Sequence, residues 1–248
     1  MPPRIIHQLW IGDRPVPEKY RQNQTDWREK NPEWEYRFWG NDRVEELISR
    51  QDRDIRRLWV LLASDPYGTI KRADLARMLI IHEFGGVYLD MDLVPVNSLE
   101  TLFSADRVYN RNLQRVRQMP DIPSADFRDV PSYSLILSFE HCAIDQIGHG
   151  VANGVLIADA GCKFFPIFIN EQMDQHRGKV LDFVGTWAWT RFIRRYAGQM
   201  KGNTLILPPH YFLWETHWYD GDPKDWTISK HPAENTWGDK TKAEWWSV

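Results

Sequence analysis

The sequence has few cysteines and no long hydrophobic run. Only two of its 248 residues are cysteine, Cys142 and Cys162, and they form neither a C-x-x-C pair nor a histidine-rich zinc pattern. A disulfide framework is therefore not expected, which fits a reducing compartment. No segment is apolar over the roughly 20 residues that a membrane-spanning helix requires. The N-terminal stretch MPPRIIHQLWIG also lacks a charged leader before a long apolar run. We therefore expect a soluble, cytoplasmic protein.

An excess of charge of one sign is also missing. The net charge of −3 gives no support for a nucleic acid as partner. The chain contains no glycine-rich phosphate loop, no G-x-G-x-x-G and no Ser-His-Asp order. Gly85-Gly86 ends a predicted helix, which is the wrong polarity for binding an anion at a helix N-terminus. Tryptophan, by contrast, is abundant with 13 residues, and most of them are expected in the core, although indole faces also stack on bases and sugars.

The pattern of apolar residues predicts an α/β fold. Short apolar, β-prone runs predict strands at 5–12, 33–39, 133–140, 154–158 and 204–209, and a strand with a turn at 87–96. Helical patterns predict helices at 17–30, 41–50, 54–63, 69–84, 164–176 and 186–198, with Asn41 or Asp42 as the N-cap of the second. The order β-α-β-α-α-β in the N-terminal half predicts a mostly parallel sheet with helices on its faces.

The organisation along the chain indicates a single domain over residues 1–248. Residues 104–132 are rich in Arg, Asp and Pro with weak periodicity, which predicts a loop or insertion. The tail after Pro208 is rich in Trp and His and has few regular signals. We expect such a tail to be ordered, either by packing across the domain or by closing over a ligand.

Two carboxylates follow the apolar run of residues 85–89 in the stretch GGVYLDMDLVPV. In an extended segment, Asp90 and Asp92 point the same way with a repeat of about 6.6 Å. Like charges at that distance repel each other unless a cation neutralises them. Mg²⁺ and Mn²⁺ take carboxylate oxygens and leave sites for phosphates, and open α/β sheets bind ligands at the carboxyl ends of their strands. The alternative is a pair of solvated turn residues, because D-x-D is common by chance.

The helix before this strand carries Asp74 and Arg77, which on their own would be an exposed i, i+3 ion pair. The combined stretch KRADLARMLIIHEFGGVYLDMD resembles the DXD sugar-binding region of glycosyltransferases related to the yeast initiating α-1,6-mannosyltransferase. More distantly it resembles the large clostridial glucosylating toxins. These enzymes share Asp-x-x-Arg on a helix, followed by Gly-Gly-x-Tyr-x-Asp-x-Asp.

The resemblance extends to IIHQLWIG at residues 5–12 and to NPEWEYRFWGND at residues 31–42. It is weaker in NGVLIA from Asn153, VGTWAWT from Val184 and ISKHPAENTW at residues 228–237. Two positions depart from the family pattern. Thr186 stands where proline is usual, and a single His231 stands where two histidines are usual.

The resemblance implies a GT-A fold and retaining, metal-dependent transfer of a sugar from a nucleotide-sugar donor. The donor would be a UDP-sugar or GDP-mannose, and the acceptor a hydroxyl of a glycan or glycolipid, which is compatible with peripheral membrane association. The cofactor would be Mn²⁺ or Mg²⁺. Residues 1–97 would form the half that binds the nucleotide-sugar, and residues 133–248 the acceptor side and closing segment.

The same resemblance assigns roles on the donor side. Trp10 would stack on the donor base, with backbone amides of the strand end at Ile11 reading the base edge. Asn41 would contact the ribose, with a plain helix cap as the alternative. Asp74 and Arg77 would bind sugar hydroxyls and orient the anomeric carbon.

Around the diphosphate, Asp90 and Asp92 would bind through the metal, one of them directly and the other partly through water. Asp92 would thus join Asp74 and Arg77 as the catalytic set. His231 would be a third metal ligand or a diphosphate contact, unless it is an ordinary loop histidine. Trp237 would cap the diphosphate or merely pack. Asn153 would contact the donor sugar, unless it is an ordinary turn residue.

Two other functions fit parts of the sequence. A metal-dependent phosphohydrolase also uses D-x-D, but haloacid-dehalogenase-like enzymes place it on an early strand and usually follow it with Thr, whereas Leu93-Val94 follow here. A non-catalytic carbohydrate-binding protein would suit the tryptophan content. It predicts no need for the two aspartates and no response to nucleotides.

Overall fold

The computed structural model describes residues 2–103, 133–139, 150–207, 209–213, 223 and 227–232. A central six-stranded sheet has the strand order β2-β1-β3-β6-β5-β7. Its strands are β1 (Ile5–Leu9), β2 (Glu35–Trp39), β3 (Gly86–Leu89), β5 (Leu135–Phe139), β6 (Val151–Ala158) and β7 (Thr204–Leu207). A separate two-stranded sheet pairs β4 (Val94–Pro95) with β8 (Ser229–Lys230). The predicted loop at 104–132 lies outside the described residues.

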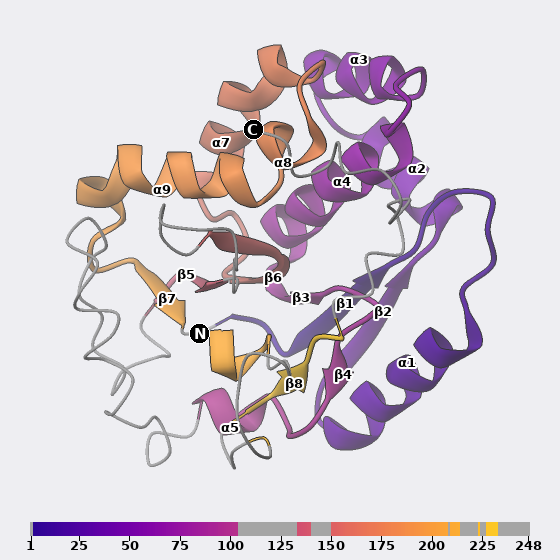
Figure 1. Cartoon of the computed structure of the whole chain (residues 1–248), viewed down its shortest axis with the longest axis vertical. Coiled ribbons are helices and arrows are strands. Elements are labelled where there is room, and N and C mark those ends of the chain that lie inside the picture. The colour runs from indigo at the N-terminus through magenta and orange to yellow at the C-terminus, as the bar shows by residue number, and fades with distance from the viewer. Residues whose placement is uncertain are drawn as a thin grey trace.

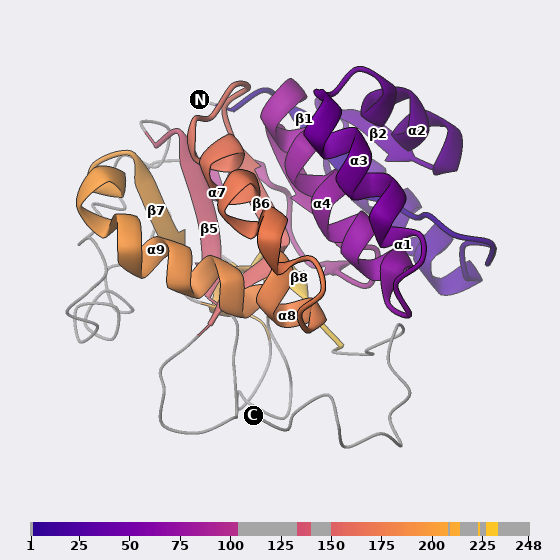
Figure 2. The ribbon, with the colours of Figure 1, turned by 90° about the horizontal axis from the view of Figure 1, so that it is seen from above.

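Helices cover both faces of the sheet. They are α1 (Glu18–Lys30), α2 (Asn41–Ser49), α3 (Arg53–Leu62), α4 (Gly68–Phe84), α5 (Glu100–Phe103), α7 (Phe164–Gln172), α8 (Val180–Phe183) and α9 (Thr186–Met200), with 3₁₀ turns η3 (Met173–Gln175) and η4 (Pro209–Tyr211). Figure 1 shows α2 to α4 and α7 to α9 on one side of the sheet and α1, α5 and the β4–β8 pair on the other. Figure 2 looks down onto the first of these layers. Within the described residues, no helix is both long and apolar enough to cross a bilayer.

The strand directions confirm the predicted mostly parallel α/β sheet. Strands β2, β1 and β3 are mutually parallel, and β7 is parallel to β5. Strand β6 is antiparallel to both of its neighbours, β3 and β5. The amino end of β6 therefore lies at the same edge of the sheet as the carboxyl end of β3. This reversal allows residues that open β6 to meet residues that follow β3.

Each face of the sheet has its own hydrophobic core. Side chains alternate along β3, so Tyr88 joins the cluster beneath α4, whereas Val87 and Leu89 join the cluster beneath α1. In the first cluster Trp189 stacks on Phe168 with ring centroids 4.2 Å apart. Of the seven tryptophans that the structure describes, five are buried, as the prediction of a core role expects: Trp27, Trp34, Trp39, Trp59 and Trp189. For the six tryptophans outside the described residues it stays a prediction.

The reversal from α4 into β3 needs two glycines. Gly85 and Gly86 have φ of 65° and 94°, and a Cβ on Gly86 would lie 2.5 Å from the carbonyl oxygen of Ile5. The Gly85 carbonyl accepts a hydrogen bond from Nε2 of the buried His7, at 3.0 Å, while Nδ1 of His7 accepts from the indole of Trp39, at 3.0 Å. Burial lowers the pKa of His7 to about 4, so its ring is neutral in this structure at pH 7.

Two local predictions were wrong. Gly40, with extended backbone, is the N-cap of α2, and Asn41 is its first helical residue. The Asn41 side chain instead binds Gly12, accepting from its N–H at 2.9 Å and donating to its carbonyl at 3.1 Å. Strand β3 also ends at Leu89 instead of continuing through Asp92. Residues 90–93 form a turn closed by the Leu93 N–H on the Asp90 carbonyl at 3.2 Å, so the two aspartates do not follow the alternation of a strand.

Candidate active site

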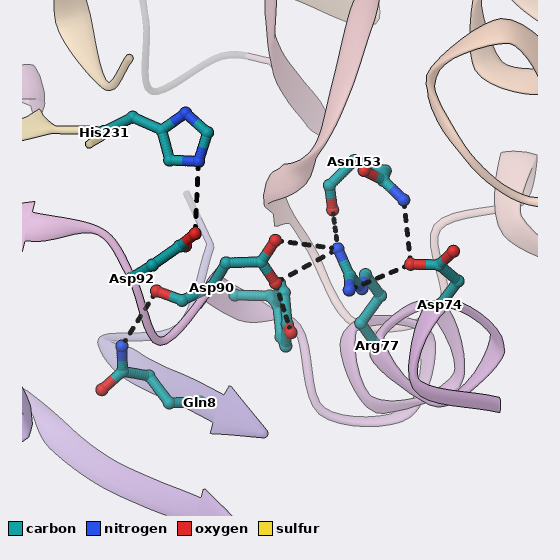
Figure 3. A network of polar contacts seen from close by, with 8 residues as sticks. Gln8, Asp74, Arg77, Asp90, Asp92, Asn153 and His231 are labelled. Carbon is teal, nitrogen blue, oxygen red and sulfur yellow. Dashed lines mark hydrogen bonds and ion pairs between the residues drawn. The ribbon is translucent and has the colours of Figure 1, made fainter. Parts of the chain in front are cut away.

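The predicted donor-sugar and diphosphate residues meet at the carboxyl end of β3. Figure 3 shows α4 contributing Asp74 and Arg77, the turn after β3 contributing Asp90 and Asp92, and the start of β6 contributing Asn153. The polar contacts in this group join residues that lie up to 79 positions apart in the chain. The sheet and α4 therefore build this site together.

A bulge in β6 brings its polar residues into the site. The pairing of β5 with β6 jumps from Leu137↔Leu156 to Ser138↔Ala152, which leaves residues 153–155 out of that ladder. These residues turn to β3 instead: Val155 pairs with Leu89, and the Gly154 carbonyl accepts from the Asp90 N–H at 2.9 Å. Bulges commonly re-aim side chains beside functional sites. Here the bulge directs Asn153 toward α4.

Arg77 connects the parts of the site. Its Nη2 lies 2.9 Å from Oδ1 of Asp74, and its Nη1 lies 3.2 Å from each carboxylate oxygen of Asp90. Nη1 also donates to the carbonyl of Asn153 at 2.9 Å. The Asp74 and Arg77 side chains are only 3% and 8% exposed, so the alternative of an exposed surface pair is wrong. A buried ion pair is held by such additional hydrogen bonds, because they offset the cost of removing its charges from water.

The two carboxylates bound by Arg77 are both unusually basic. Burial raises the pKa of Asp74 to about 7 despite the nearby Arg77, and Nδ2 of Asn153 donates to its Oδ1 at 3.0 Å. Burial likewise raises the pKa of Asp90, which accepts from the Tyr88 hydroxyl at 2.8 Å. Burial opposes the charge on Arg77, but its carboxylate neighbours outweigh that effect, and the pKa of its guanidinium is raised. Within the described residues, its Nε is buried without a hydrogen-bond partner.

Asp92 and His231 form a second, more accessible pair. Nε2 of His231 lies 3.4 Å from Oδ2 of Asp92, and the two side chains are 21% and 18% exposed. Antiparallel pairing of Val94 with Lys230 explains this contact, because it places the residue after β8 beside the residues before β4. The hydrogen bond and charge of His231 lower the pKa of Asp92 although burial opposes them. The predicted proximity of His231 to the D-x-D pair is thus present in the structure.

Sequence reasoning missed two residues that shape this site. A Cβ on Gly154 would lie 2.7 Å from Oδ2 of Asp90, so only glycine leaves room for the carboxylate against β6. Tyr88 had been recognised only as part of a motif, yet its hydroxyl binds Asp90 directly. The signal for the first was present, since a glycine inside a strand pattern often marks a bulge or a close approach.

The predicted base residues Trp10 and Ile11 lie in the loop after β1, and the predicted ribose residue Asn41 opens α2. Trp10 is half-buried, donates from Nε1 to the Arg14 carbonyl at 2.7 Å, and has its ring centroid 5.7 Å from that of Tyr20. Ile11 is half-buried next to it. Asn41 braces this loop through Gly12, whose Cβ would lie 3.2 Å from Thr69 at the start of α4. The loop therefore borders α4, the helix that carries Asp74 and Arg77, the residues predicted to bind the sugar.

The donor atoms at the D-x-D turn fit a divalent cation. Asp92 is ionised, partly exposed and adjacent to an imidazole nitrogen, a combination of ligands that suits Mn²⁺ or Mg²⁺. Asp90 is 30% exposed and already binds Arg77 and Tyr88, which suits a less direct ligand. Within the described residues, no group of three His, Cys, Asp or Glu side chains is close enough to form a complete metal site. The predicted diphosphate cap, Trp237, lies outside those residues.

Comparison with known proteins identifies relatives of the part of the chain that contains the D-x-D turn. Residues 17–109 match the family described as the glycosyltransferase sugar-binding region containing DXD motif, which confirms the predicted resemblance. Inositol phosphoceramide mannosyltransferase 3 of Schizosaccharomyces pombe is 34% identical over 101 residues, covering 40% of this chain and 27% of that protein. The initiation-specific alpha-1,6-mannosyltransferase of Candida albicans is 28% identical over 108 residues, covering 41% and 27%. The match thus spans about a quarter of the length of these curated relatives.

Among solved structures, the PaToxG glycosyltransferase superposes with a TM-score of 0.55 at 13% identity, over 80% of this chain and 72% of that chain. At such low identity the likeness concerns the fold. It confirms that the chain has the predicted GT-A glycosyltransferase fold.

Proposed function

We propose that this protein is a metal-dependent glycosyltransferase that moves a sugar from a UDP- or GDP-sugar to a hydroxyl of a glycan or glycolipid, with retention of configuration. The observation that carries the proposal is the Arg77 network. One guanidinium binds Asp74 and Asp90, and through Asn153 it joins the helix, the strand end and the bulge beside a D-x-D turn. The match of residues 17–109 to the DXD family supports the same proposed function, sugar transfer.

The donor sugar would lie against Asp74, Arg77 and Asn153. These side chains offer a carboxyl group with a pKa of about 7, an amide and a guanidinium within hydrogen-bonding distance of one another. Sugar hydroxyls both donate and accept hydrogen bonds, so such a mixed set can bind them. The Nε of Arg77 is buried and has no partner among the residues that the structure describes, so it is one further donor that a hydroxyl could satisfy after a small rearrangement.

The diphosphate would lie on the side of Asp92 and His231. A bound Mn²⁺ or Mg²⁺ would supply positive charge to the departing nucleoside diphosphate. Asp92 and His231 would hold the ion, with Asp90 contributing less directly because Arg77 and Tyr88 occupy its oxygens. Arg77 would additionally keep Asp90 oriented toward the turn.

The ion pairs that Asp74 and Asp90 form with Arg77 support a transfer that retains the configuration of the anomeric carbon. Burial raises the pKa of both Asp74 and Asp90, but Asp74 is only 3% exposed beneath Arg77, and both oxygens of Asp90 are bound by Tyr88 and Arg77, so neither carboxylate is presented to an acceptor hydroxyl as a general base. In retaining transfer on one face, the acceptor oxygen bonds to the anomeric carbon while the bond to the phosphate oxygen breaks. That phosphate oxygen receives the acceptor's proton, so no protein base is required.

The names of the relatives suggest which substrates to test first. Several are called mannosyltransferases, and the S. pombe protein is named for inositol phosphoceramide. We therefore propose GDP-mannose as the first donor to assay and a glycolipid with a polyol phosphate head as the first acceptor. UDP-sugars remain the second donor class.

A thermal-shift and calorimetry panel tests the proposal. UDP, GDP and their sugars are added to the protein with and without Mn²⁺, and the same panel is run on Asp92→Asn. A ligand at one hundred times its dissociation constant stabilises the native state by about 2.7 kcal/mol, so a true donor is readily detected. We expect stabilisation by one nucleotide family that requires both Mn²⁺ and Asp92. Binding of sugars without any response to nucleotides would instead identify a carbohydrate-binding protein, and release of inorganic phosphate would identify a phosphohydrolase.

A further inference from the structure

The buried side of α1 carries a row of polar side chains aimed at the segment that contains the D-x-D turn. Asn23 and Trp27 are spaced i, i+4 and so share one face of α1, Asn31 follows as the C-cap residue, and all three are buried. Asn23 donates from Nδ2 to the Met91 carbonyl at 2.9 Å. Trp27 donates from Nε1 to the Leu93 carbonyl at 3.0 Å. Oδ1 of Asn31 accepts from the backbone N–H of Leu99 at 2.7 Å.

The spacing of this row matches the spacing of the carbonyls that it binds. Asn23 and Trp27 lie about 6 Å apart along α1, the rise of four helical residues, and the carbonyls that they bind, of Met91 and Leu93, are two positions apart in the turn. Donors at i and i+4 on α1 can therefore meet the carbonyls of residues 91 and 93. These two bonds lie on either side of Asp92, so they determine where its backbone sits.

A third donor holds the turn from the sheet. Gln8, fully buried on β1, donates from Nε2 to the Asp90 carbonyl at 3.2 Å. Its own Oε1 accepts from the Tyr36 hydroxyl at 2.7 Å, which fixes the orientation of the amide. Figure 3 shows Gln8 beneath the turn on the strand side. Three of the four carbonyls of residues 90–93 are thus bound by side chains from two different elements.

Burial makes this arrangement costly unless it is complete. A buried amide or indole N–H that loses its acceptor costs about 1–3 kcal/mol, whereas apolar side chains at positions 23 and 27 could pack the same core without that risk. Asn23 and Trp27 nevertheless place hydrogen-bond donors on the face of α1 that packs on the apolar core. Because hydrogen bonds are directional, these donors fix the geometry of the turn.

We propose that Gln8, Asn23 and Trp27 are positioning residues that set the relative placement of the Asp90 and Asp92 carboxylates for binding the metal–diphosphate group. This inference rests on the proposed function. The same segment continues into β4, whose pairing with β8 places His231 beside Asp92. The α1 face therefore also determines the position of His231 relative to the turn.

A matched pair of tryptophan variants tests the proposal. Trp27→Phe removes the indole hydrogen bond to Leu93, and Trp59→Phe removes an indole bond of similar length, 2.9 Å, to Glu45 between α2 and α3. Both side chains are buried, at 0% and 4% exposure. Asn23→Leu, which keeps the number of side-chain heavy atoms and removes the donor to Met91, is the second test variant. The probe is Mn²⁺, titrated by electron paramagnetic resonance into each folded protein with saturating UDP or GDP.

We expect Trp27→Phe and Asn23→Leu to raise the dissociation constant of Mn²⁺ by about fivefold, and Trp59→Phe to leave it unchanged within about twofold. Equal Mn²⁺ affinity in all variants would overturn the positioning role, and so would an equal loss in Trp27→Phe and Trp59→Phe, which would indicate general destabilisation. A wild-type protein that binds neither nucleotide with Mn²⁺ would overturn the proposed function itself. The two failures are therefore distinguishable.

Discussion

Replacing Gly154 by alanine should disturb the candidate site with a single methyl group. The new Cβ would lie 2.7 Å from Oδ2 of Asp90 and 3.3 Å from its Cγ. Ordinary contacts begin near 3.4 Å, so the carboxylate must retreat by about 0.7 Å, from 3.4 − 2.7. The contacts between Asp90 and Arg77 are already 3.2 Å long, and a retreat of that size would break at least one of them.

The magnitude follows from the bond that is lost. Hydrogen bonds to charged groups contribute about 1.5–3 kcal/mol, and the 30% exposure of Asp90 lets water replace part of that. We therefore expect Gly154→Ala to lower the free energy of unfolding by about 1–2 kcal/mol. At about 2–4 °C per kcal/mol for a chain of this length, Tm should fall by about 2–8 °C.

The assay combines thermal unfolding with Mn²⁺-dependent turnover of the nucleotide-sugar that the protein binds. Turnover should fall at least tenfold, because Asp90 and the turn that follows it are displaced together. Gly198→Ala is the matched control: it lies in α9, is exposed, and its Cβ would meet nothing within 4 Å. That variant should be neutral or gain about 0.5–1 kcal/mol from reduced chain entropy. Wild-type stability and turnover in Gly154→Ala would refute the steric argument.

Three further predictions concern single side chains. Asp92→Asn should fold normally yet lose Mn²⁺-dependent nucleotide binding in calorimetry, and chelation of the wild type should have the same effect; retained binding would contradict a metal role for Asp92. Arg77→Met should lower the free energy of unfolding in urea by about 3–5 kcal/mol, because Asp74 and Asp90 lose the charge that compensates them. Adding Asp74→Asn should recover part of that loss. No recovery would count against the network of ion pairs around Arg77. His7 has a folded pKa of about 4 against 6.5 unfolded, so its contribution is complete above pH 6.5 and is lost as the pH falls toward 4. By pH 5 it should cost about 2 kcal/mol, a loss that His7→Gln should not show; equal pH dependence in both proteins would refute this assignment.

The sequence by itself determined the elements and the chemistry that they carry. Hydrophobic periodicity is a local property, so α4, α9 and strands such as β6 were predictable from short windows. The D-x-D pair and the Asp-x-x-Arg pair were likewise visible, because each is a pattern that spans only a few residues. These features sufficed for the α/β class, the GT-A resemblance and most of the residues that meet around Arg77.

Only the tertiary structure decided how those residues are held, because their partners are distant in the chain. Asn153 reaches Asp74 across 79 positions, and Asn23 reaches Met91 across 68. No local window contains both members of such a pair, so neither the bulge in β6 nor the polar row on α1 could be foreseen. The same holds for the end of β3 at Leu89: side-chain donors from β1 and α1 bind the carbonyls of residues 90, 91 and 93, and so stabilise a turn where local β-propensity favoured a strand.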